Sequence, residues 1–402
     1  MSTGRREEPA DPGTGAPERG AGAAARQRQL DRFVRYRALS RAYFHLPVLF
    51  VYLYAGGLSV ALVEVLLAVY GLLIVLGAPA SGWLLRRMSL RTVVCLGEAL
   101  KVAGVALLAT GPRVPTALAG QAVGALGYSL AAGTDSALLS GLAGGDRELY
   151  RRYEARSAAA IFLAALAGGV VGAVLFVREQ TLPFWASVAF SLAALATAAR
   201  IRPATEPPAP ARGEAAPGLP AAARFWPRYY AITRAFVLAP YVGLLPFLLY
   251  VTLKVPVAWF GVVLGVYGLT SFAVARSSRR LAVALGPRRL GWASMVLCAA
   301  ALAVLGLAGS VWVALLGVLA LGLGGGVVRP VAMSNLDAAM AGWSGAQRSA
   351  LLSVQERLYG AWNTAILLAG GLALQATGIR AVLVGLAAVY ALSLTVLAAL
   401  RR

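Results

Sequence analysis

The stretch LCAAALAVLGLAGSVWVALLGVLALGL, residues 297–323, contains no charged side chain. Similar apolar stretches lie on both sides of it, each about 20 residues long, which is the length a helix needs to cross roughly 30 Å of hydrocarbon. Inside lipid such a segment must satisfy its own backbone hydrogen bonds, and it therefore forms a helix. The alternating pattern of an outer-membrane barrel is absent. The 402-residue chain is predicted to be an all-α membrane protein.

Twelve transmembrane helices are expected, six on each side of a linker rich in proline and alanine. They span residues 38–57, 61–85, 92–110, 115–140, 155–177, 183–199, 229–252, 256–276, 289–308, 311–337, 350–376 and 379–400. Residues 1–35 are rich in glycine, proline and charged residues and lack an apolar core, which predicts a disordered tail rather than a signal peptide. The predicted domains are this tail, six-helix bundles over 36–199 and 229–402, and a linker over 200–228.

The basic residues predict the orientation of the chain. Its net charge of +21 would suggest nucleic acid as a partner of a soluble protein, but here the position of the charge matters more. With the tail, the linker, the carboxyl terminus and alternate loops on one side, that side holds 31 of the 37 lysines and arginines. Positive residues stay in the cytoplasm. We expect a multi-pass protein of the cytoplasmic (inner) membrane with both termini inside and no nucleic-acid partner.

The chain also repeats itself. Val69–Leu72 recurs as Val266–Leu269, an offset of 197 residues. At an offset of 202, Asp135, Glu154 and Ala167–Gly169 recur as Asp337, Glu356 and Ala369–Gly371. Coincidence in a sequence rich in alanine and glycine is the alternative. Two matching six-helix bundles joined by a linker are the parallel-repeat plan of a rocking transporter.

Two stretches resemble the major facilitator superfamily. Residues 79–91, PASGWLLRRMSLR, are similar to its Gly-x-Leu-x-Asp-Arg-x-Gly-Arg-Arg signature, with Arg86 in place of the aspartate and Ser89 in place of the second glycine. Residues 132–139 and 153–156 resemble a bacterial branch of the family. The resemblance implies a fold of two pseudo-symmetric six-helix bundles and secondary active transport of a small molecule by alternating access. It also implies proton-coupled export, that is, efflux by an antiporter.

In that family the residues near these loops form a cytoplasmic gate. The residues placed there in the first half are Arg86, Arg87, Arg91, Asp135, Glu154 and Arg156. Asp337, Glu356 and Arg357 repeat the arrangement in the second half, near Arg276, Arg279 and Arg280. Ion pairs among these residues would hold the two halves closed, although partly exposed pairs are individually weak. The alternative is that the charges only anchor helix ends.

Ionisable residues within the membrane segments are costly and need a role. Glu98 and Lys101 lie three residues apart on one helix face, which predicts a self-paired lock, with proton coupling as the alternative. His45 is a third coupling candidate because histidine titrates near neutral pH; the alternative is a solvated histidine at the membrane interface. Glu64 lies near the external face and is expected to reach the headgroups.

The resemblance implies a central cavity lined by the first, fourth, seventh and tenth helices. By position its polar lining is Tyr52, Gln121, Tyr128, Tyr241, Arg329 and Asn335. Arg329 keeps its charge in any protein environment. It can therefore bind an anionic substrate group or pair with Asp135 or Asp337.

The remaining features argue against an enzyme. The chain has one histidine and two cysteines, with no metal-ligand spacing and no nucleotide-binding loop, so no metal, cofactor or catalytic residue is expected. The expected partners are a small-molecule substrate, protons and the lipid bilayer, with the chain as a monomer because each half covers the apolar face of the other. A membrane sensor or scaffold without flux and a membrane-embedded enzyme remain the alternatives.

Overall fold

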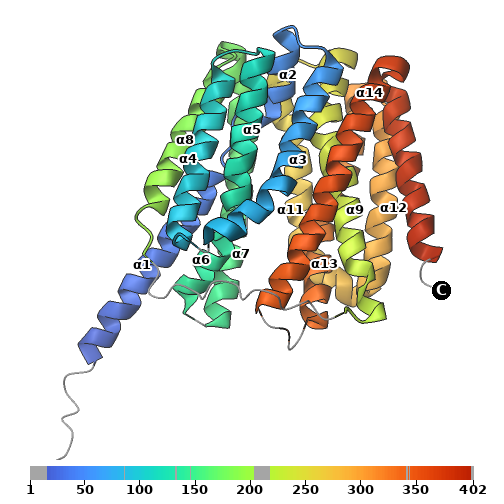
Figure 1. Ribbon diagram of the computed structural model, residues 1–402. Helices are drawn as coiled ribbons and strands as arrows, with labels where there is room; N and C mark the ends of the chain where they lie inside the picture. Colours follow the sequence, from blue (N-terminus) through green and yellow to red (C-terminus); the bar gives the residue numbers. More distant parts are fainter. Residues whose placement is uncertain are drawn as a thin grey trace, which may run out of the picture.

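The computed structural model describes residues 16–85, 87–131, 134–144, 146–202, 218–340, 343 and 345–399, and these residues form helices and no strand. The first half contains α1 (Ala16–Ser40), η1 (Leu46–Val48), α2 (Leu49–Ala55), α3 (Val60–Leu85), α4 (Leu90–Ala109), α5 (Val114–Ala131), α6 (Thr134–Ala143), α7 (Arg147–Arg178) and α8 (Leu182–Ala198). The second half contains η2 (Ala221–Ala223), α9 (Phe225–Ala239), η3 (Pro240–Leu244), α10 (Leu245–Phe247), η4 (Leu248–Thr252), η5 (Val257–Trp259), α11 (Phe260–Leu285), α12 (Pro287–Gly306), α13 (Val311–Ala339) and α14 (Gly345–Ala399). The long helices lie side by side in one bundle (Figure 1).

Eight helical stretches of the described residues are long and apolar enough to cross a membrane. One of them, Val354–Ala398, contains two helices, because Gly378 takes a φ of 78° inside α14 and reverses the chain there. Leu46–Ala55 and Leu182–Ala198 are shorter apolar helices. Together with α5 and its continuation α6, these segments are consistent with the predicted set of twelve membrane helices.

The bundle has two chemically different ends. The start of α1, the end of α14 and the connections α3–α4, α6–α7 and α11–α12 lie at one end, which we call the arginine-rich end (Figure 1). The connections α2–α3, α4–α5 and α7–α8 and the bend in α14 lie at the other, which we call the short-loop end. Both ends of the described chain therefore lie on the same side.

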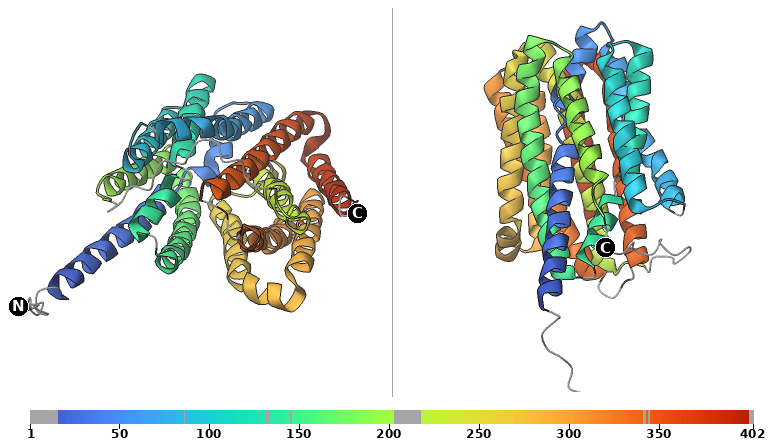
Figure 2. Two further views of the ribbon diagram at one scale, coloured as in Figure 1. Left: turned by 60° about the horizontal axis from the view of Figure 1, so that its bottom comes forward. Right: turned by 90° about the vertical axis from the view of Figure 1, so that its left-hand side faces the viewer.

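The two halves meet along two pairs of helices, α3 with α14 and α7 with α11 (Figure 2). On the first seam Val75 packs against Gly360, and on the second the rings of Phe162 and Phe272 stack at 5.1 Å. At the short-loop end two aromatic pairs join α2 to the α9–η4 segment. Phe50 lies 5.9 Å from Phe247, and Tyr54 lies 6.3 Å from Tyr250. These four contacts between the halves lie at the short-loop end and near the middle of the helices.

The first membrane segment differs from the sequence prediction. The disorder predicted for residues 1–35 is wrong from Ala16 onward, where α1 begins; residues 1–15 lie outside the described part of the chain. The helix expected over 38–57 is interrupted between Ser40 and Leu46. Pro47 explains the interruption, because proline disfavours helical backbone in the residue before it and lacks an N–H donor. Because of the interruption, α1 packs against the bundle as a helix separate from α2.

Smaller differences concern helix ends. The segment expected from 155 begins at Arg147, where the Asp146 side chain accepts a hydrogen bond from the Leu149 N–H and caps the helix. In the linker expected over 200–228, residues 203–217 lie outside the described part, and α9 already begins at Phe225.

Candidate functional site

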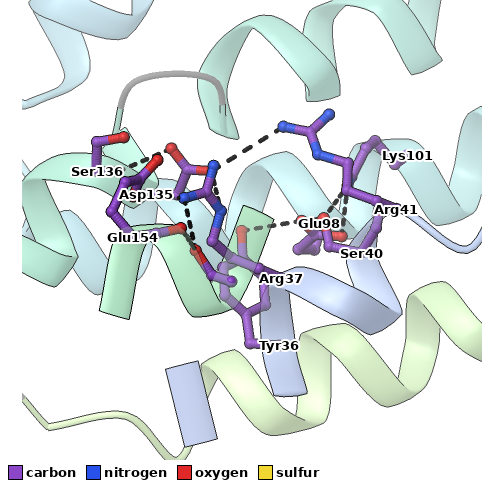
Figure 3. A network of polar contacts seen from close by, with 10 residues as sticks. Tyr36, Arg37, Ser40, Arg41, Glu98, Lys101, Asp135, Ser136 and Glu154 are labelled. Carbon is purple, nitrogen blue, oxygen red and sulfur yellow. Dashed lines mark hydrogen bonds and ion pairs between the residues drawn. The ribbon is translucent and has the colours of Figure 1, made fainter. Parts of the chain in front are cut away.

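A buried cluster of charges ties α1 to α6 and α7 (Figure 3). Arg37 Nε lies 3.3 Å from Asp135 Oδ2, and Arg37 Nη1 lies 2.8 Å from Glu154 Oε2. Arg41 Nη2 lies 4.0 Å from Asp135 Oδ2. Only 11% of the Arg37 side chain and 5% of the Asp135 side chain are exposed, so solvent screens this cluster weakly.

Three of the four arginines predicted to pair with these carboxylates have other partners, so that part of the gate prediction is wrong for them. Arg87 stacks on the ring of Trp83, and Arg91 donates to the backbone carbonyl of Ala199. Arg156 pairs with Asp31 at 2.7 Å. Arg86 lies outside the described residues. The reason is α1: it extends beyond the predicted start of the first membrane helix, and its own arginines reach the carboxylates first.

The second half has a smaller cluster. Arg234 Nη1 lies 2.9 Å from Glu356 Oε1, to which the Tyr230 hydroxyl donates at 2.6 Å. The Arg234 guanidinium also lies 4.3 Å from the centre of the Tyr359 ring. The predicted neighbours of Glu356 are not its partners, because Arg276, Arg279 and Arg280 are exposed on α11 and occur in none of the described ion pairs. Asp337 and Arg357 are exposed as well.

The two clusters are related by the internal repeat. Arg234 follows Arg37 by 197 residues, and Glu356 follows Glu154 by 202, which are the two offsets of the repeat. Each half thus carries the same arginine–glutamate pair between its first and its fifth membrane segment. Each ion pair of the described residues lies within one half. In this arrangement the pairs anchor helix ends, and a role in holding the halves together stays a prediction.

The predicted self-pairing of Glu98 and Lys101 is confirmed. Lys101 Nζ lies 2.8 Å from Glu98 Oε2, and both side chains are buried (Figure 3). The hydroxyls of Ser40 and Tyr36 on α1 donate to Glu98 Oε1 at 2.8 and 3.1 Å, and Lys101 donates to the Ser40 carbonyl at 3.2 Å. The pair therefore holds α4 against the last turn of α1.

Two other intramembrane residues lie deeper than expected. His45 is buried in the break of the first segment, with Nδ1 2.9 Å from Ser187 Oγ. The alternative prediction of a solvated histidine at the membrane interface is therefore wrong. Glu64 does not reach the headgroups: its side chain is 0% exposed, and neither carboxyl oxygen has a hydrogen-bond partner. The sequence placed Glu64 at a helix start, but α14 and η3 cover it.

Four predicted cavity residues have contacts within the protein or are buried, and two of them, Tyr52 and Tyr241, join neighbouring helices. Tyr52 is buried and donates to the Leu108 carbonyl at 3.0 Å, while Gln121 is buried in α5. Asn335 donates to the Val331 carbonyl of its own helix, and Tyr241 packs against Tyr267 with ring centres 4.3 Å apart.

Tyr128 lies where the two halves face each other, and Arg329 lies beside the Arg234 cluster of the second half. The Arg41 guanidinium lies 4.5 Å from the centre of the Tyr128 ring, and Tyr128 lies near Arg234 and Glu356 of the other half. Arg329 is exposed on α13 and lies near Tyr230 of its own half. The structure thus brings together a surface of arginines and tyrosines from both halves, Arg41, Tyr128, Arg234, Arg329 and Tyr359, which we call the arginine–tyrosine seam.

Four members of these clusters were not predicted from the sequence: Arg37, Arg41, Arg234 and Tyr359. One signal was available: the offset of 197 residues that relates Val69 to Val266 also relates Arg37 to Arg234. Arg41 and Tyr359 carry no such signal, because their importance depends on how the halves face each other.

These features define a polytopic membrane protein built from two related helical bundles with a charged seam between them. The Major Facilitator Superfamily model matches residues 39–342, more than half of the chain, and the chain belongs to that family. None of the curated proteins matches it in sequence.

Solved structures of several transporters are similar to this chain. The nucleoside transporter NupG is 11% identical with a TM-score of 0.74, and the match covers 93% of this chain and 98% of NupG. A POT family transporter in complex with a thioalcohol-conjugated peptide is 12% identical with a TM-score of 0.72, covering 92% and 96%. The human organic anion transporter MFSD10 (TETRAN) is 18% identical with a TM-score of 0.68, covering 92% and 99%. At these identities the likeness shows the fold.

Proposed function

We propose that this protein is a secondary active transporter that moves a small molecule across the cytoplasmic membrane by alternating access. The observation that carries the proposal is the uneven distribution of contacts between the halves. Aromatic pairs join them at the short-loop end, whereas the described ion pairs at the arginine-rich end each stay within one half. Two rigid bundles joined at one end can rock about a site between them.

The arginine–tyrosine seam supports a substrate with an anionic group next to an aromatic or apolar part. Arginine binds carboxylate and phosphate through two parallel hydrogen bonds, and tyrosine rings supply apolar contact with a polar tip. Arg41 and Arg234 already have carboxylate neighbours, Asp135 and Glu356. Arg329 occurs in none of the described ion pairs, and it is the arginine we expect to meet the substrate anion.

The distribution of basic residues supports placing the arginine-rich end in the cytoplasm, with both termini inside. Coupling to protons and the direction of export stay predictions, with Glu98, Lys101 and His45 as the coupling candidates. The monomeric state also stays a prediction.

A ligand screen followed by a flux assay tests the proposal. Purified protein is heated with carboxylates and organic phosphates, each paired with its neutral amide or alcohol. We expect some anions to raise the unfolding temperature, their neutral counterparts not to, and Arg329→Ala to abolish the shift. Arg380→Ala is the control, because Arg380 is exposed at the short-loop end.

The stabilising anion is then used in a counterflow assay with proteoliposomes. Accumulation of the labelled anion supports transport. Binding without any flux, for every stabilising anion, would contradict the proposal and favour a sensor or scaffold. Chemical conversion of the bound molecule would favour a membrane-embedded enzyme.

A further inference from the structure

Glu64 is a carboxyl group without a polar partner inside the membrane part of the molecule. It lies in the second turn of α3 and is 0% exposed, and neither Oε1 nor Oε2 has a hydrogen-bond partner. The other buried carboxylate with 0% exposure, Glu98, has Lys101, Ser40 and Tyr36 around it. Fully buried acidic residues normally have partners of that kind. Glu64 therefore needs a different explanation.

The surroundings of Glu64 come from the opposite half. A Cβ atom on Gly243 of η3 would collide with both carboxyl oxygens, and a Cβ atom on Gly371 of α14 would lie 2.5 Å from Glu64 Cβ. Two glycines on two different helices thus leave the space that the side chain fills. The carboxyl group is sealed only while α3 packs against η3 and α14, which is the arrangement in which the short-loop end is closed.

Among the residues that the structure describes, no charged group compensates Glu64 in this arrangement. Several elements pack around α3 at the depth of Glu64, and we consider their titratable and charged groups. These are Tyr241 on η3, Arg380 on α14, Tyr52 and Tyr54 on α2 and Arg113 before α5, with Tyr70 further along α3 itself. Tyr241 packs on Tyr267, Tyr52 donates to Leu108, and Tyr54 packs on Tyr250. Arg113 and Arg380 are exposed. None of these groups bonds to the Glu64 carboxyl.

We propose that Glu64 binds a proton when the short-loop end closes and releases it when that end opens. An ionised carboxylate sealed without a partner is far more costly than the neutral acid, so the closed arrangement holds the protonated form. Separation of α3 from η3 and α14 admits water, which solvates the carboxylate. The proton then passes to water at the short-loop end, and closure takes one proton back from the same side.

Because uptake and release occur at one end, this site does not itself carry protons across the membrane. It makes the balance between the two states depend on the pH at the short-loop end. The closed state binds one more proton than the open state, so acid favours closure. In the pH range where the Glu64 carboxyl is ionised in the open state and protonated in the closed state, the ratio of closed to open molecules falls by up to about tenfold for each unit of rising pH. The inference rests on the proposed function only in requiring that the short-loop end opens.

The first test measures closure directly. Spin labels at Ser59→Cys and Thr377→Cys, both exposed at the short-loop end, report the distance between α3 and α14 in a background with Cys95→Ala and Cys298→Ala. We expect the short distance to dominate at low pH and a longer one to gain with rising pH. Glu64→Gln, a neutral side chain of the same shape, should keep the short distance at all pH values. Glu179→Gln, which changes an exposed carboxylate at the same end, should behave like the parent.

A distance distribution that responds to pH equally in the parent and in Glu64→Gln would overturn the proposal, as would one that does not respond in the parent. A second measurement avoids the cysteine replacements. Infrared difference spectra of the natural chain, recorded between two pH values that both lie above the range in which exposed carboxylates titrate, should contain the band of a protonated carboxyl group, and Glu64→Gln should lack it. The same band in both proteins, or in neither, would contradict the proposal.

Neither measurement requires a substrate. A pH-dependent distance without flux would support the proton site and contradict the transport proposal. Flux together with a pH-independent distance would support the transport proposal and contradict the proton site.

Discussion

The two halves use different chemistry at equivalent places. In the first half, α4 is held against α1 by the buried ion pair of Glu98 and Lys101. In the second half the residues 197 positions later are Met295 and Cys298, and α12 is held against α9 by a hydroxyl pair, with Tyr229 Oη 2.7 Å from Ser294 Oγ. One half is fastened by buried charge and the other by a neutral contact.

The repeated arginine–glutamate pairs also differ between the halves, since the pair of the first half is more deeply buried. Arg37 bridges Asp135 and Glu154 with 11% of its side chain exposed, whereas Arg234 has one carboxylate partner among the described residues, Glu356, which is 50% exposed. Asp337, the repeat of Asp135, is exposed and occurs in none of the described ion pairs. From this comparison we infer that the charge cluster of the first half is fastened more firmly, while the more exposed cluster of the second half can exchange partners with a ligand. Four substitutions test this difference.

The largest effect is expected for Lys101→Met. It leaves the Glu98 carboxylate buried without its cation, and removal of one member of a buried pair costs about 3–5 kcal/mol. Unfolding by SDS should show a loss of this size. The double variant Glu98→Gln/Lys101→Met should recover part of the loss, because it buries no uncompensated charge. A single variant as stable as the parent would show that the pair does not fasten α4 to α1.

Arg37→Gln should have the next largest effect, a loss of about 2–3 kcal/mol, which is less than for a fully buried pair because Glu154 is partly exposed. It leaves two carboxylates close together, Asp135 in the first turn of α6 and Glu154 in the third turn of α7. Arg37→Lys keeps the charge but loses the bridging geometry, and it should lie between the parent and Arg37→Gln in SDS unfolding. Equal stability of all three proteins would show that the bridge made by Arg37 does not stabilise the fold.

Tyr229→Phe tests the neutral contact of the second half. It removes one buried hydrogen bond and should cost about 1 kcal/mol. Ser294 keeps its own bond to the Gly291 carbonyl at 2.8 Å, so no hydroxyl group is left unsatisfied. A loss as large as that of Lys101→Met, measured under the same conditions, would contradict the contrast between the halves.

Arg234→Gln should change stability least, by about 0.5 kcal/mol, because a half-exposed ion pair is screened by solvent. It should nevertheless reduce the anion-induced rise in unfolding temperature. Arg276→Gln, an exposed arginine on α11, is the control and should change neither quantity. Strong destabilisation by Arg234→Gln would mean that its cluster is as rigid as that of the first half.

Much of the fold could be predicted from the sequence. The length of each apolar segment and the placement of the arginines are local properties of the sequence, and they determine which segments cross the membrane and in which orientation. The carboxylates Asp135, Glu154 and Glu356 were correctly expected to make ion pairs. Their partners were not, because that choice depends on how far α1 continues before the break near Pro47. Composition alone favours disorder in the tail, but packing of Phe33 and Tyr36 against the bundle outweighs it.

The environment of Glu64 could not be predicted either. Near the start of α3 a carboxylate has a short path to water, which is why the sequence favours an exposed position. Its burial follows from Gly243 and Gly371, more than 170 residues away in the chain, which approach only when the two halves dock.

Alternating access itself is tested most directly by measuring two distances in one set of samples. Spin-label pairs are placed at Ser59 and Thr377 for the short-loop end and at Met88 and Arg279 for the arginine-rich end, all of them exposed. Across pH values and with a stabilising anion, we predict that the two distances change in opposite directions, so that one end closes as the other opens. Distances that lengthen together, or two fixed distances under all conditions, would contradict the account.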